Sequence, residues 1–124
     1  MRIPSDHLDD GEATLRPYCS ADARELFDAL RDEPAWEHIP HSMPRDFDEL
    51  DASVWAGLAD GHRLVFTVRR AGLVVGRTSV IWDESSPEGV EIGGTQFDPA
   101  VRGTGVNTRA KEMLIREVFD QGAA

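Results

Sequence analysis

The stretch VEIGGTQFDPAVRGTGVN, residues 90–107, contains a β-like run that ends at Phe97, a turn with two glycines, and the start of a helix-like run near Asn107. Gly103 and Gly105 permit positive φ, and they let a ligand approach the backbone where a β carbon would collide. The helix that follows directs its unpaired N–H groups and the positive end of its dipole at the turn. This arrangement is typical of a site for an anion, most often a phosphate.

Two common phosphate loops agree poorly with this turn. A Walker loop needs Lys and then Ser or Thr after the second glycine, whereas Val106 and Asn107 follow Gly105. A dinucleotide fingerprint needs a third glycine within a βαβ unit, whereas Thr108 stands in that place after an antiparallel hairpin. The alternative to a phosphate site is a helix N-cap that uses two glycines for its turn.

Hydrophobic periodicity on either side of the stretch predicts an α+β, or mixed α/β, fold with a mostly antiparallel sheet flanked by helices. A Ser20 N-cap and a spacing typical of helices start the first helix. The dipeptide AG at 71–72 predicts a tight hairpin between two β-rich runs. The predicted helices cover about 20–32, 45–59 and 106–121, and the predicted strands cover 13–18, 63–70, 73–82 and 89–97.

Charge is distributed unevenly along the 124 residues. The formal net charge of −10 lies entirely in residues 1–62, whereas residues 63–124 are neutral overall. An acidic first half argues against DNA or RNA binding, which draws on clustered Lys and Arg. It either attracts a cationic substrate or simply keeps the surface solvated. The length fits one domain, with residues 1–12 expected as a flexible N-terminal segment.

Cellular location follows from what the sequence lacks. No run approaches the roughly 18 apolar residues of a membrane span, and the first residues contain no apolar core of a secretory signal. The single cysteine, Cys19, cannot form an internal disulfide. We therefore expect a cytoplasmic protein.

A pair of histidines raises the question of a metal. His38 and His41 form an H-x-x-H pair, but no third ligand stands in register, and the surrounding prolines indicate a loop. We therefore expect no metal.

Arg69 and Arg70 are expected to be solvated strand ends, although a nearby phosphate would suit them.

Residues 102–107, Arg-Gly-Thr-Gly-Val-Asn, resemble the pyrophosphate-binding turn of the GNAT superfamily of acetyl-CoA-dependent N-acetyltransferases. The family pattern is Arg or Gln, two residues, Gly, one residue, then Gly or Ala, and Asn107 departs from it at the last position. Asparagine tolerates left-handed backbone and can cap a helix. The likeness extends over nearly the whole chain. LRPYCSADARELFDAL (15–30), the stretch at 90–107 and RAKEMLIREVFDQGA (109–123) are similar to the branch that acetylates ribosomal-protein N-termini.

The resemblance implies a coenzyme site along the fourth strand and the turn. The strand end would pair with the pantetheine arm of acetyl-CoA like an added strand, and its N–H groups would polarise the thioester carbonyl. The turn would bind the pyrophosphate through its amides. The implied cofactor-binding residues are Thr95, Gln96, Phe97, Arg102, Gly103, Thr104, Gly105, Val106 and Asn107.

The resemblance also implies residues for the amine. In many members a glutamate on the fourth strand takes the amine's proton, directly or through water, and Glu91 matches it. The alternative for Glu91 is a carboxylate that faces solvent or pairs with Arg77 on the neighbouring strand. Trp36, Glu37 and His38 are expected to contact the amine.

Family members continue past this helix with a fifth strand, another helix and a closing hairpin, so the chain is expected to be a single GNAT-like domain, 1–124, incomplete at its C-terminus. The missing part would supply one wall of the coenzyme cleft and usually a tyrosine as general acid, whereas the only tyrosine here is Tyr18. We expect direct acetyl transfer, in a ternary complex, to a primary amine, either a protein N-terminus or a small cationic amine. The alternative is a non-catalytic module that forms a homodimer through an exposed sheet edge and keeps at most residual CoA binding.

Overall fold

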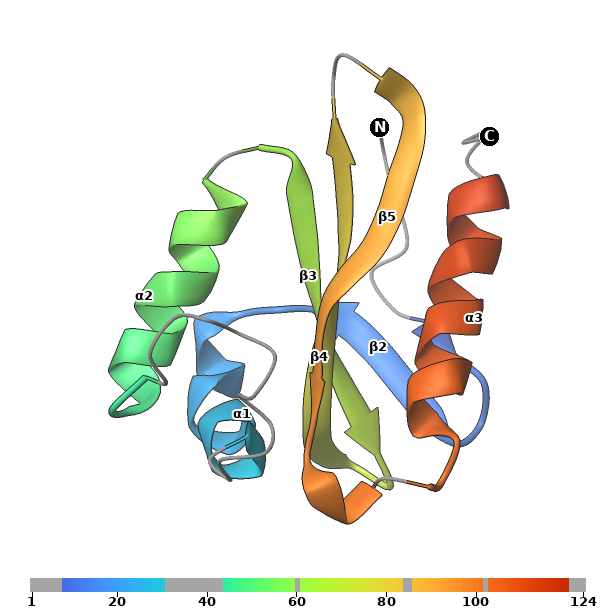
Figure 1. The fold of residues 1–124 in the computed structure, drawn as a ribbon. Helices are drawn as coiled ribbons and strands as arrows, with labels where there is room; N and C mark the ends of the chain where they lie inside the picture. Colours follow the sequence, from blue (N-terminus) through green and yellow to red (C-terminus); the bar gives the residue numbers. More distant parts are fainter. Residues whose placement is uncertain (1–7, 31–43, 60, 84–85, 102, 121–124) are drawn as a thin grey trace.

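The computed structural model describes residues 8–30, 44–59, 61–83, 86–101 and 103–120. In these residues one sheet carries two helices on one face and a third on the other (Figure 1), which confirms the α+β class. The strands are β1 (Leu8–Asp9), β2 (Ala13–Pro17), β3 (Arg63–Arg70), β4 (Leu73–Asp83) and β5 (Ser86–Phe97). The helices are α1 (Ala23–Leu30), α2 (Phe47–Leu58) and α3 (Val106–Asp120), with the short 3₁₀ helices η1 (Ser20–Asp22) and η3 (Pro99–Val101).

The strands follow one another across the sheet in the order β1-β2-β3-β4-β5, and every neighbouring pair is antiparallel. The β3–β4 hairpin closes through Ala71 and Gly72, both with positive φ, so the tight turn predicted from AG is confirmed. This order places β5 at one edge of the described sheet, directly before the glycine turn and α3.

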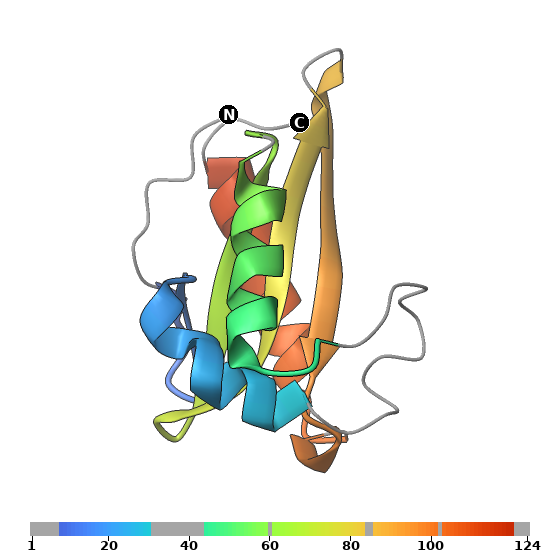
Figure 2. The same ribbon diagram turned by 90° about the vertical axis from the view of Figure 1, so that its left-hand side faces the viewer.

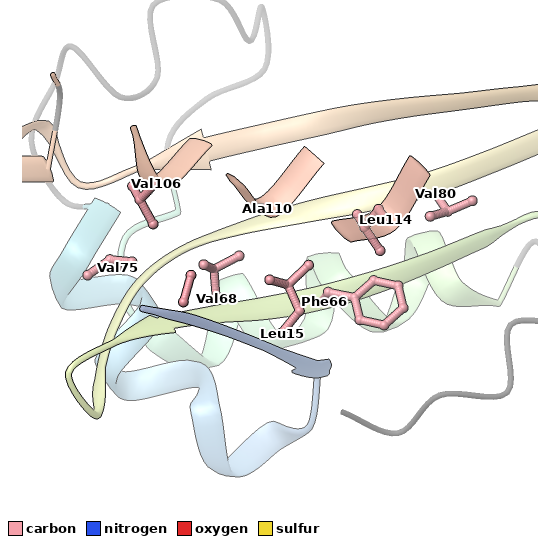
Figure 3. Packing of buried hydrophobic residues seen from close by; sticks show 9 residues of the cluster. Leu15, Phe66, Val68, Val75, Val80, Val106, Ala110 and Leu114 are labelled. Atoms are coloured by element: carbon pink, nitrogen blue, oxygen red, sulfur yellow. The ribbon is translucent and has the colours of Figure 1, made fainter. Parts of the chain in front are cut away.

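Two hydrophobic cores hold the layers together, one on each face of the sheet. The first packs α3 against the sheet and includes Leu15, Phe66, Val80, Ala110 and Leu114, all within 2% of complete burial (Figure 3). The second packs α1 and α2 against the opposite face. Since α3 is bound to the sheet along its length, its N-terminal end is fixed relative to the end of β5.

The starts of α1 and α2 differ from the sequence prediction. Ser20 does not cap a helix, because Cys19 is the N-cap of η1 and the Asp22 carboxylate accepts its amide hydrogen at 3.2 Å. The Ser20 hydroxyl instead accepts a hydrogen bond from the Trp55 indole at 2.8 Å. The second helix begins two residues later than expected, because Asp46 caps it through the Glu49 amide.

The N-terminal segment and β5 are also more regular than predicted. Leu8–Asp9, expected within a flexible segment, forms β1 and pairs with β2. β5 begins at Ser86 rather than at residue 89. Among the described residues, none of the helices has the length and apolar character that crossing a membrane would require.

Candidate functional site

The turn between β5 and α3 exposes its backbone. Gly103 and Gly105 have φ of +82° and +83°, values that residues with a β carbon rarely adopt. Thr104 is exposed together with both glycines, whereas Val106, the first residue of α3, is buried in the core. The core thus anchors the helix, and the turn itself stays open to solvent.

Hydrogen bonds within the turn use few of its amides. The hydroxyl of Thr104 donates to the carbonyl oxygen of Val101 at 2.6 Å, and the Thr104 amide donates to the same oxygen at 3.2 Å. No acidic residue stands in the first turn of the 15-residue α3, so the positive end of its dipole is not neutralised there. In the described part of the chain, no acceptor is found for the amides of Gly103, Gly105, Asn107 and Thr108.

The space beside the two glycines is free. A β carbon built on Gly103 or Gly105 would meet no atom within 4 Å. Several unpaired N–H groups beside open space at a helix N-terminus match the donor set that phosphate groups need. The pyrophosphate of acetyl-CoA therefore fits this turn. Arg102, expected in the same set, lies outside the described residues.

The residues expected to flank the coenzyme arm stand at the end of β5, and their side chains are engaged inside the protein. Phe97 packs on the core beneath α3. Gln96 is buried, and its Oε1 accepts a hydrogen bond from Nε of Arg77 at 2.9 Å. The hydroxyls of Thr95 and Thr78 lie 2.9 Å apart. A ligand at this strand end would therefore meet mainly backbone groups.

β5 contains a bulge that the sequence analysis did not predict. Between the pairs Arg77–Gln96 and Ser79–Gly93, two residues of β5 face one residue of β4. A bulge bends its strand and takes a residue out of regular pairing. The signal was the glycine pair at 93–94, because glycine inside a strand often marks a bulge.

The outer edge of β5 is available for pairing. No strand follows it in the described sheet, and Figure 2 shows β5 (orange) along the edge. Alternate N–H and C=O groups of an edge strand point outward. An extended ligand can pair with such an edge as a further strand.

Glu91 lies on the same strand, well before the turn. It is exposed and stands opposite Ile81, and a β carbon built on Gly93 would lie 3.3 Å from its Oε1. The alternative ion pair with Arg77 is not formed, since Arg77 lies opposite Gln96 instead. From Glu91 to Phe97 the strand rises by about 20 Å. A ligand that reaches both the carboxylate and the turn must therefore be elongated.

Arg69 and Arg77 are both engaged on the face covered by α1 and α2. Arg69 donates from Nη2 to Asp22 at 2.8 Å, so it is not the solvated strand end that the sequence suggested. Burial alone would raise the pKa of Asp22, but hydrogen bonds from Arg69, Thr67 and the Cys19 amide outweigh burial and hold this pKa below its usual value. Burial, with the nearby charge of Arg63, lowers the pKa of Arg77 to about 10.

Tyr18 is also committed to structure. Its hydroxyl donates to Asp51 at 2.7 Å, and burial together with this bond raises the pKa of Tyr18. Tyr18 is therefore not assigned as the general acid. The expected amine contacts Trp36, Glu37 and His38, and the H-x-x-H pair, lie outside the described residues.

Comparison with protein families gives one match that spans most of the chain. The family model of the acetyltransferase (GNAT) domain matches residues 12–124. A search of curated proteins finds no match.

Solved structures share the fold at low sequence identity. A probable acetyltransferase of the GNAT family from Chromobacterium violaceum is similar with a TM-score of 0.88 and 21% identity, over 99% of this chain and 64% of that one. An acetyltransferase from Salmonella typhimurium that modifies the N-terminal serine of a ribosomal protein has a TM-score of 0.76 and 15% identity, over 92% of this chain and 67% of that one. A microcin self-immunity acetyltransferase in complex with acetyl-CoA and AMP has a TM-score of 0.73 and 20% identity, over 92% and 66%. The chain thus spans less than two thirds of the length of the Chromobacterium protein.

Proposed function

The chain belongs to the GNAT acetyltransferase family, and we propose that it takes part in the transfer of an acetyl group from acetyl-CoA to a primary amine. The transfer is direct, with both substrates bound together. Acetyl-CoA supplies an activated thioester, and the chain binds it, orients it and removes a proton from the amine.

One observation carries this proposal. The amides of Gly103, Gly105, Asn107 and Thr108 have no acceptor among the described residues at the N-terminus of α3, and both glycines stand beside open space. A helix N-terminus with free amides favours phosphate groups, because both the donors and the dipole complement negative charge. A simple N-cap would not require two glycines with positive φ and open space at both.

The edge of β5 continues the proposed site. The pantetheine arm pairs with the outer edge near Thr95, Gln96 and Phe97, whose side chains are held inside the protein. Backbone N–H groups at or near the bulge polarise the thioester carbonyl, and they need no reorganisation because the sheet fixes them.

Glu91 acts as the general base. Its carboxylate takes a proton from the amine, directly or through a water, and the nitrogen lone pair then attacks the thioester carbon. The carbon–nitrogen bond forms, the carbon–sulfur bond breaks, and the sulfur leaves with coenzyme A and takes up a proton. The exposed position of Glu91 on β5 lets an amine reach it from solvent.

The acidic first half of the chain supports a cationic acceptor. The net charge of −10 in residues 1–62 attracts a cationic amine, such as a basic peptide N-terminus, a polyamine or an aminoglycoside. The similar Salmonella protein modifies an N-terminal serine, which favours the peptide. Trp36, Glu37 and His38 remain the proposed amine contacts. A cytoplasmic location agrees with the single cysteine.

A calorimetric titration with acetyl-CoA tests the proposal, followed by an acetylation assay on a peptide with N-terminal serine and on spermidine. We expect saturable acetyl-CoA binding and acetylation of at least one amine. Absence of acetyl-CoA binding would contradict the proposed site. Binding without acetylation of any amine would contradict the proposed reaction for this chain.

A further inference from the structure

A serine in the middle of the sheet has no side-chain hydrogen bond to any of the described residues, although it is buried. Ser79 is only 2% exposed, yet no partner for its hydroxyl is found among the described residues. Buried polar groups are nearly always bonded, so an exception calls for a reason. The other buried polar side chains of the described residues form hydrogen bonds. Asp22 bonds with Thr67 and Arg69, Thr78 with Thr95, and Gln96 with Arg77.

The hydroxyl of Ser79 is not sealed from water. In the described part of the chain, no side-chain oxygen or nitrogen that is completely buried lacks a partner. The unbonded oxygen of Ser79 must therefore retain some contact with solvent. A water-sized polar group can therefore touch this oxygen.

The sheet places Ser79 beside Glu91. Ser79 stands opposite Val65 on β3 and Gly93 on β5, and opposed residues of an antiparallel pair project from the same face. Val65 belongs to the core under α1 and α2, so Ser79 also faces that side. Glu91, two residues from Gly93, projects from this face as well.

The side chains of Glu91 and Ile81 lie over Gly93. A β carbon at Gly93 would lie 3.3 Å from Oε1 of Glu91 and 3.4 Å from Cδ1 of Ile81. The Glu91 carboxylate therefore extends over Gly93, the residue that stands directly opposite Ser79. Opposed Cα atoms are about 5 Å apart. A hydroxyl and a carboxylate thus border one small patch on a single face.

We propose that Ser79 positions the amine acceptor, an inference that rests on the proposed acetyl transfer. The Ser79 oxygen accepts a hydrogen bond from one N–H of the amine, while Glu91 takes another of its protons. The two groups fix the nitrogen from two sides, and its lone pair is left to face the thioester carbon. Ser79 forms no covalent bond and gains no proton.

The test is Ser79→Ala, assayed with a peptide carrying an N-terminal serine and with spermidine. Loss of one neutral hydrogen bond is expected to raise KM for the better amine about three- to tenfold. Affinity for acetyl-CoA is expected to stay unchanged, and so is the urea midpoint, because the hydroxyl has no partner among the described residues. Ser79→Thr, which keeps a hydroxyl, should recover most of the amine KM. Ser53→Ala, an exposed serine on α2, is the matched control and should match the wild type.

Each outcome separates the two proposals. If the wild type acetylates an amine and Ser79→Ala has the same KM for that amine, this inference is overturned and the proposed function stands. A wild type that binds acetyl-CoA but neither acetylates nor binds either amine in a calorimetric titration would overturn both. A raised KM together with a lowered urea midpoint, not recovered by Ser79→Thr, would assign Ser79 to structure and overturn the positioning role.

Discussion

The ring of Phe97 lies directly over Gly76, and a β carbon built on Gly76 would stand 2.6 Å from Cδ1 of this ring and closer still to the carbonyl oxygen of Gln96. This contact fixes the last residues of β5 against β4. The strand end leads directly into the turn proposed to bind pyrophosphate. Packing at Gly76 should therefore matter for binding as well as for stability.

Gly76→Ala is expected to destabilise the chain by about 1–3 kcal/mol, because the added carbon overpacks a filled position. Acetyl-CoA affinity should fall too, since the displaced strand end moves the turn. Urea unfolding and calorimetry measure the two effects. Gly57→Ala is the control, because its β carbon would only touch Arg63 at 3.6 Å, and alanine should stabilise α2. Equal stability of Gly76→Ala and wild type would contradict the packing account.

Gly105→Trp is expected to abolish acetyl-CoA binding, because the indole fills the open space beside the free amides. Gly61→Trp controls for backbone strain, as Gly61 has a similar φ of +78° and equally open surroundings but lies after α2. Urea unfolding should show a comparable loss of stability in both variants. Calorimetry should find binding only in the control, and retained affinity in Gly105→Trp would refute the placement of the site.

Glu91→Gln is expected to lower kcat for the amine about a hundredfold or more, because the amide cannot accept the proton. Acetyl-CoA affinity should not change, since Glu91 lies about 20 Å along β5 from Phe97, where the strand ends before the turn. Glu112→Gln, an exposed glutamate on α3, should behave as the wild type in both assays. A kcat for Glu91→Gln within twofold of the wild type would exclude Glu91 as the base.

Asp22→Asn tests the pairing with Arg69 through the pH dependence of stability. The folded-state pKa of Asp22 is lowered, so its contribution is complete above the unfolded-state pKa, near 3.8, and is lost as pH falls through the folded value. At pH 7 the variant should be less stable by about 1–3 kcal/mol. In urea unfolding, the difference from wild type should shrink below pH 4. A difference in the free energy of unfolding that stays constant from pH 7 to pH 2 would rule out this linkage. Asp28→Asn, at an exposed position, provides the control.

Much of the fold could be predicted from local signals. The change from helical to alternating spacing predicted β3 and β4, and the AG dipeptide predicted their turn. The resemblance of residues 102–107 to a pyrophosphate turn led to the GNAT family, which the family model confirms. The turn alone was only moderately specific, and the order and spacing of the similar segments along nearly the whole chain supported the resemblance.

Features that depend on distant partners could not be predicted. The side-chain partners of Asp22, Thr67 and Arg69, are 45 and 47 residues away. An ion pair between Glu91 and Arg77 was the alternative to a catalytic role, but the register places Ile81 opposite Glu91 and Gln96 opposite Arg77. The position of Ser79 beside Glu91, with no hydroxyl partner among the described residues, becomes visible only once three strands stand side by side. Sequence spacing predicts faces, whereas hydrogen-bond partners are set by register.

The central claim is that the turn before α3 binds the pyrophosphate of acetyl-CoA, and amide NMR of the ¹⁵N-labelled chain tests it most directly. On titration with acetyl-CoA, the amide signals of Gly103, Gly105, Asn107 and Thr108 should shift together and saturate, whereas that of Gly61 should not move. Saturable binding that leaves these four signals in place, or no binding at all, would contradict the account.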